Sequence, residues 1–120
     1  MSDLLDPDPE FGNLSADELR SVVSRRRDSV LRRGRALMEL GRRARTPAQL
    51  SEVAAMIRAP EHRQLRAAGN TSVSQLGAAG LVAGGTQGAR ALAAELAREW
   101  DPGEQSDFAW LMKSSGMTWT

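Results

Sequence analysis

The chain has 120 residues, of which 41% are hydrophobic and 4% aromatic, with no tyrosine and no cysteine. This length suffices for one buried core and not for two, and the lack of cysteine excludes disulfides and thiolate metal sites. The net charge is +1, but the signs are segregated: the first 18 residues hold six acids and no base, whereas residues 20–45 hold ten arginines and two acids.

The hydrophobic residues are mostly Leu, Ala, Val and Met rather than the β-branched and aromatic types that favour strands. The composition therefore predicts an all-α domain. No apolar run approaches the roughly 20 residues that span a bilayer, and the acidic start is unlike a secretory signal. We expect a cytoplasmic protein that does not enter a membrane.

The first residues, 1–13, are predicted to form an acidic, flexible arm. Two prolines follow aspartates in Asp6-Pro7-Asp8-Pro9, and each proline disfavours a helical conformation of the residue before it. Phe11 and Leu14 are apolar enough to attach the arm to the body. A single helical domain is expected over residues 14–115, followed by a tail over 116–120.

Three segments, residues 15–18, 46–49 and 101–104, place a short polar residue three positions before Glu or Gln. In this capping box the first side chain accepts from a free amide of the first helical turn, and the Glu or Gln accepts from the amide of the cap residue. In the second and third segments a proline follows the cap, where its missing N–H is no loss. All three are predicted helix starts.

Apolar residues at spacings of three and four extend these starts into a row of helices. The predicted helices cover residues 16–45, 47–58, 61–68, 71–83, 87–100 and 102–113. The first is either one helix or two, with a break near Asp28–Ser29. Gly77 and Gly80 weaken the fourth helix, so we expect them to allow close approach of a neighbouring helix.

Two helix pairs share a pattern. Met-Glu-Leu-Gly at 38–41 matches Ser-Gln-Leu-Gly at 74–77, and the apolar run 53–57 matches 92–96. Two-helix units near 40 residues long are typical of HEAT and armadillo repeats. Residues 29–113 thus resemble a short HEAT-like repeat protein, which implies five or six helices in antiparallel pairs. The charged start of a HEAT unit is approximated only at Gln64-Leu65-Arg66, and the alternative is an irregular helical bundle.

Two motifs carry candidate chemistry, and we favour a structural role for each. The glycine-rich segment 84–88 is similar to the phosphate-binding turn of short-chain dehydrogenases, but Arg90 replaces a required glycine and too few residues follow for a βαβ unit. A glycine C-cap followed by a Thr86 N-cap is the better interpretation. His62 is the only histidine and is predicted to be exposed, so we expect no metal, no cofactor and no enzymatic activity.

The arginines of residues 20–45 are spaced so that several lie on the solvent side of a helix. They could contact nucleic-acid phosphates, or be neutralised by the acids near both ends of the chain. Four of the five aromatic residues lie after position 99. Trp100 and Phe108 are predicted to close the core. Trp110 lies off the face of Phe108, so we expect a large side chain to be exposed there, as at interaction hot spots.

The resulting prediction is a non-enzymatic protein–protein interaction module, an adaptor or scaffold that presents a helical repeat surface. A solenoid this short leaves its end helices uncovered, so we expect a homodimer or docking on a larger complex. The alternative is a small nucleic-acid-binding protein that uses the arginine-rich helix. The candidate partner-binding residues are Arg25, Arg32, Arg33, Arg42, Arg43, Trp110 and Trp119.

Overall fold

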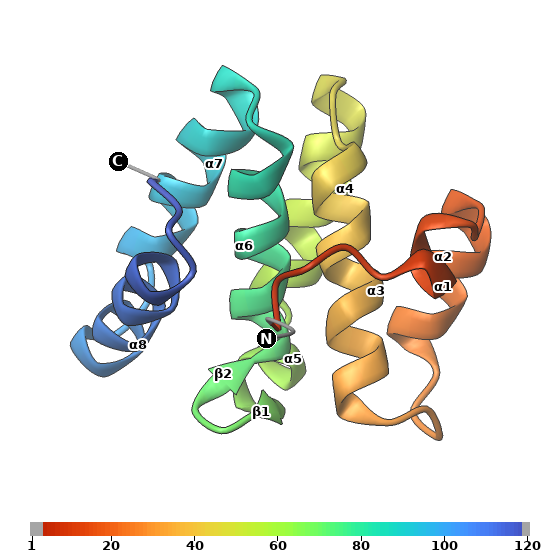
Figure 1. Cartoon of the computed structure of the whole chain (residues 1–120), viewed down its shortest axis with the longest axis horizontal. Helices are drawn as coiled ribbons and strands as arrows, with labels where there is room; N and C mark the ends of the chain where they lie inside the picture. The colour runs from red at the N-terminus through yellow and green to blue at the C-terminus, as the bar shows by residue number, and fades with distance from the viewer. Residues whose placement is uncertain (1–3, 119–120) are drawn as a thin grey trace.

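The computed structural model describes residues 4–118 and confirms the all-α fold class, with a single short β-hairpin in this range (Figure 1). The elements are α1 (Pro9–Gly12), α2 (Ala16–Ser24), α3 (Val30–Arg43), α4 (Pro47–Arg58), α5 (Pro60–Gln64), β1 (Arg66–Ala68), β2 (Thr71–Ser72), α6 (Val73–Gly84), α7 (Gln87–Arg98) and α8 (Pro102–Ser114). None of the helices in this range is long and apolar enough to cross a membrane.

Helix α6 forms the centre of the molecule. Its residues from Val73 to Val82 are all buried, and it lies between α3 and α7 in Figure 1. Its most extensive contact is with α3, and it also packs against α4, α5 and α7. A helix that is apolar on all sides is stable only when neighbours cover every face, which explains why the others are arranged around this one.

Glycines allow the backbones of α3 and α6 to approach closely, as predicted for Gly80, whereas Gly77 makes room for the side chains of Leu37 and Ile57. A Cβ atom on Gly41 would lie 2.8 Å from the carbonyl oxygen of Gly77 and 2.9 Å from the amide nitrogen of Leu81. A Cβ atom on Gly80 would collide with the backbone of Met38. The helix–helix crossing therefore depends on residues without side chains.

The three predicted capping boxes are confirmed at the starts of α2, α4 and α8. A fourth, which was not predicted, starts α6: the Ser72 hydroxyl accepts from the Gln75 amide, and the Gln75 side chain accepts from the Ser72 amide. Both residues are buried. The Gln75 amide group also donates to the carbonyl of Glu104 at 3.0 Å, which attaches the start of α8 to the central helix.

The segment that was predicted as either one helix or two forms two, α2 and α3. Ser29 is the N-cap of α3 and accepts from the amide of Arg32, whereas Arg25 at the end of α2 is extended. The break lies at the alternative boundary, near Asp28–Ser29. It lets α2 turn back and pack against α3.

The prediction of a helix over residues 61–68 is wrong in its second half. Helix α5 ends at Gln64, Leu65 is extended, and residues 66–72 form an antiparallel hairpin of β1 and β2. Gly69, with φ of 54°, begins its two-residue turn. Glycine suits this position because the turn of a short hairpin requires a positive φ. Gly69-Asn70 therefore closes a hairpin rather than capping a helix.

The segment predicted as a flexible arm contacts the body from Leu4 onward and contains the short helix α1. Asp8 caps this helix by accepting from the amide of Glu10, and Pro9 takes the first helical position. The prolines therefore start a helix instead of preventing one. Leu5 and Phe11 are buried in the core, and α1 packs against α3.

Candidate interaction surface

The arginines of α3 are largely occupied by the N-terminal segment. Arg32 forms an ion pair with Glu10, and its guanidinium lies 5.3 Å from the centre of the Phe11 ring. Arg35 pairs with Asp8 at 2.9 Å. Acids of the N-terminal segment thus neutralise these two arginines, which is part of one of the two sequence interpretations.

The end of α3 is occupied in the same way. Arg42 and Arg43 share the carboxylate of Glu39 at 3.3 and 2.9 Å. Arg42 also donates to the carbonyl of Leu5, and Arg43 donates to the carbonyls of Phe11 and Gly12 at 3.1 Å. These two candidate residues therefore attach the N-terminal segment, and their donors are directed inward.

Arg33, a predicted partner-binding residue, is buried: its side chain is only 4% exposed. Its Nε donates to the carbonyl of Val23 at 2.9 Å and its terminal nitrogen to Glu61 at 3.2 Å. The bend between α2 and α3 explains this position, since a carbonyl at the end of α2 needs a donor. Arg25 remains exposed and pairs with Asp28 at 3.5 Å.

Two of the interhelical ion pairs lower the pKa of a glutamate. The Arg33 guanidinium donates to Glu61 and lowers the pKa of that carboxyl, and Arg58 does the same to Glu99 through contacts of 2.7 to 3.2 Å. A carboxyl whose pKa is lower in the folded than in the unfolded state stabilises the fold at pH values above its pKa in the unfolded state. This stabilisation is lost as the pH falls through the pKa of the folded state.

We therefore expect the free energy of unfolding to be constant near neutral pH and to decrease as the pH falls below about 4.3, the ordinary pKa of glutamate. Urea denaturation at a series of pH values between neutral and strongly acidic measures this dependence. Replacing Glu99 with glutamine should make the decrease shallower. An unchanged slope in Glu99→Gln would contradict the assigned pair with Arg58.

Of the aromatic residues near the C-terminus, Trp100 and Phe108 are buried and Trp110 is exposed, as predicted. Trp100 and Phe108 are buried and form an edge-to-face pair with ring centres 5.2 Å apart. Trp110 is 69% exposed, far more than any other large hydrophobic side chain within residues 4–118. Trp119, the other candidate tryptophan, lies outside the described residues.

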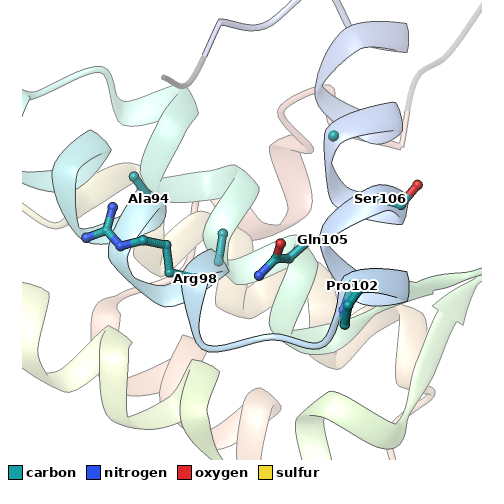
Figure 2. A pocket seen from close by; sticks show the side chains of 7 residues that line it. Ala94, Arg98, Pro102, Gln105 and Ser106 are labelled. Carbon is teal, nitrogen blue, oxygen red and sulfur yellow. The ribbon is translucent and has the colours of Figure 1, made fainter.

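Helix α8 lies at the edge of the molecule with a hollow on each side. One hollow, of about 420 Å³, separates it from α7; Gln105 extends across it toward α7, while Ser106 points the other way (Figure 2). The other hollow, of about 810 Å³, separates α8 from the turn of the β-hairpin and is lined by Trp110, Ser106 and Asp107. Helix α8 therefore forms a ridge that other helices leave largely uncovered.

The outward face of this ridge is uncharged along most of its length. At 100° per residue, Pro102, Ser106, Ala109 and Lys113 form the central line of this face, and Trp110 lies beside it; all five are exposed. Pro102, Ser106 and Ala109 carry no charge, and Lys113 is the charged end of this line. We call these five residues the α8 face.

The two motifs with possible chemistry have structural roles here. Gly85, with φ of 76°, is the C-cap of α6, and Thr86 caps α7, as predicted for the glycine-rich segment. His62, predicted to be exposed, is buried instead, and its Nδ1 lies 2.6 Å from the carbonyl oxygen of Met56. Its place in α5 against α6 explains the burial. Among residues 4–118, no group of three or more histidine or acidic side chains is placed to hold a metal ion.

Comparison with known proteins assigns no relationship. No family model matches this sequence, and no curated protein and no solved structure has significant similarity to it. The functional interpretation therefore rests on the geometry of the chain itself.

Proposed function

We propose that this protein is a non-catalytic protein–protein interaction module whose binding surface is the α8 face. The observation that carries this proposal is the exposure of Trp110 beside the small, uncharged residues Ser106 and Ala109, between two hollows. Tryptophan dominates the energetics of many interfaces, and charged residues are depleted at interface centres. An indole ring this exposed loses apolar contact with water when a partner covers it.

The arginine-rich surface gives less support to a nucleic-acid function. All five arginines of α3 already pair with acids. Phosphates would have to displace these acids, and each displacement reduces the gain from counterion release. The cations without an ion pair within residues 4–118, such as Arg27, Arg98 and Lys113, come from different elements of the chain.

A HEAT-like origin belongs to the same proposal. The helices that match in sequence, α3 with α6 and α4 with α7, also contact each other, as equivalent helices of adjacent repeats do. In this interpretation α8 follows the second of the two matching units. An adaptor or scaffold role, and the cytoplasmic location expected from the sequence, are further parts of the proposal.

The test is to replace Trp110 with alanine and to compare the proteins that co-purify with the tagged chain in its native cells. We expect the variant to lose the principal partner while its unfolding free energy changes by less than about 0.5 kcal/mol, because exposed positions contribute little to folding. Leu31→Ala is the matched control, since Leu31 is the other exposed large hydrophobic residue of the described chain and lies on α3. Equal recovery by both variants would contradict the proposed surface.

A further inference from the structure

We propose that the partner bound by the α8 face is a second copy of this chain, with the two α8 helices antiparallel across a two-fold axis. This inference rests on the proposed function of the same face. Three observations indicate that the partner is a second copy: the distribution of charge along α8, the shape of its exposed surface and the small net charge of the chain.

The charges of α8 are complementary to those of an antiparallel copy. Asp101 caps the start of the helix and Lys113 lies in its last turn; both are exposed, and neither has an ion pair among residues 4–118. In an antiparallel pair each lysine lies beside the aspartate of the other copy. A parallel pair would instead place like charges together, and antiparallel helices also align their dipoles favourably.

The shape of the face matches the same arrangement. An axis between Ser106 and Ala109 places small side chains at the crossing, where they permit close approach of two helices. A two-fold axis brings each side of α8 against the same side of the other copy. Trp110 of one copy is then directed to the hollow beside the hairpin of the other. Asp107 lines that hollow, and its carboxylate has no hydrogen bond or ion pair within the described chain, so it can accept from the indole N–H.

The overall charge also favours a second copy over a strongly charged partner. The net charge is +1, so two copies repel each other little. Around the face, the residues without an ion pair among residues 4–118 carry both signs: Asp101 and Asp107 are acidic, and Arg98 and Lys113 are basic. Such a mixture is complementary to itself, and two-fold dimers are the commonest form of self-association.

The absence of native cysteine makes site-specific cross-linking a direct test. A single cysteine is placed by Ser106→Cys next to the proposed axis, or by Ala55→Cys on the exposed face of α4 as the control. We expect a short bis-maleimide to convert the Ser106→Cys protein into a covalent dimer at low micromolar concentration. The Ala55→Cys protein should form no covalent dimer under the same conditions, because its cysteines lie away from the proposed axis.

Light scattering on the unmodified chain gives the matching equilibrium measurement. Trp110→Ala should raise the dissociation constant by about 100-fold or more, as expected for a central hot spot present twice. Lys113→Glu should raise it by about tenfold at low salt, because two exposed ion pairs become repulsive, while Lys113→Arg should have no effect.

A chain that stays monomeric up to roughly 0.1 mM would overturn the dimer. If a different protein is still lost from the Trp110→Ala variant in that case, the proposed function stands without the dimer. If no protein is lost, both proposals fail. A dimer that forms equally well in Trp110→Ala would also overturn the inference, because the copies would then meet through another surface.

Discussion

Replacing Gly80 with alanine is expected to lower the free energy of unfolding by about 3 kcal/mol or more. The new Cβ atom would lie 2.8 Å from the carbonyl carbon of Met38 and 2.9 Å from its Cα, and closer still to its carbonyl oxygen. All three obstacles belong to the backbone of α3, so no change of rotamer can relieve the collision. The two helices would have to separate along the most extensive contact of the fold.

The size of this loss in stability depends on which neighbouring atoms must move to make room for the new methyl group. Extra methyl groups in a packed core usually cost about 1–3 kcal/mol, and the smaller costs occur where a flexible side chain can shift. At Gly77 the nearest atoms to an added Cβ belong to the side chains of Ile57 and Leu37, which have some freedom to adjust. We therefore expect Gly77→Ala to cost less than Gly80→Ala, although both glycines lie on the same helix.

Urea denaturation of the two variants measures these costs, and Gly88→Ala is the matched control. Gly88 lies in the first turn of α7, where an added Cβ meets only Leu50 Cδ1, at 3.4 Å. Alanine favours a helix over glycine by up to about 1 kcal/mol, so the control should be neutral or more stable than the wild type. A loss below about 1 kcal/mol in Gly80→Ala would contradict the close crossing of α3 and α6.

The features that could be predicted from the sequence are those decided within a few residues. A capping box needs only two side chains three positions apart, and the glycine at the end of α6 needs only a left-handed conformation at one position. The exposure of Trp110 also followed from local geometry, because it lies off the face set by Phe108 and Leu111. Each of these is a property of one turn or one helix.

The features that could not be predicted depend on residues far apart in the chain. Arg58 pairs with Glu99 and Arg63 with Glu104, each across 41 residues. No pattern within one helix indicates which acid an arginine will meet, so the arginine-rich segment suggested a free surface that the structure largely fills. The hairpin was missed for a related reason: β1 is only three residues long and is stabilised by its partner strand rather than by its own composition.

The N-terminal segment combines both cases. Its prolines suggested an irregular arm, whereas Asp8-Pro9 has the local pattern of a capped helix start. What holds the segment in place is the apolar Phe11, which is only 2% exposed and lies in the same core as α3. Its environment is formed by residues that come later in the chain, so its importance could not be judged from the first thirteen residues.

Replacing Phe11 with alanine is consequently expected to cost about 3–5 kcal/mol, the usual cost of removing a buried aromatic side chain. The ion pairs Glu10–Arg32 and Asp8–Arg35 should contribute little to that sum, because they are partly exposed and surface pairs are weak. Burial of the ring, rather than charge, is therefore expected to hold the segment against α3. Urea denaturation of Phe11→Ala measures the effect, and Glu10→Gln, which removes only the charge, should cost less than about 1 kcal/mol.

The same variant separates the two roles considered for the arginines of α3. If they are only structural, Phe11→Ala should bind single-stranded nucleic acid no better than the wild type at low salt, even when the segment is released. If they form a covered phosphate-binding surface, affinity should rise, and it should fall again steeply as salt is added. Phe11→Leu, which keeps an apolar side chain, provides a folded comparison. A cost of Phe11→Ala no larger than that of Glu10→Gln would show that the segment is not anchored by this ring.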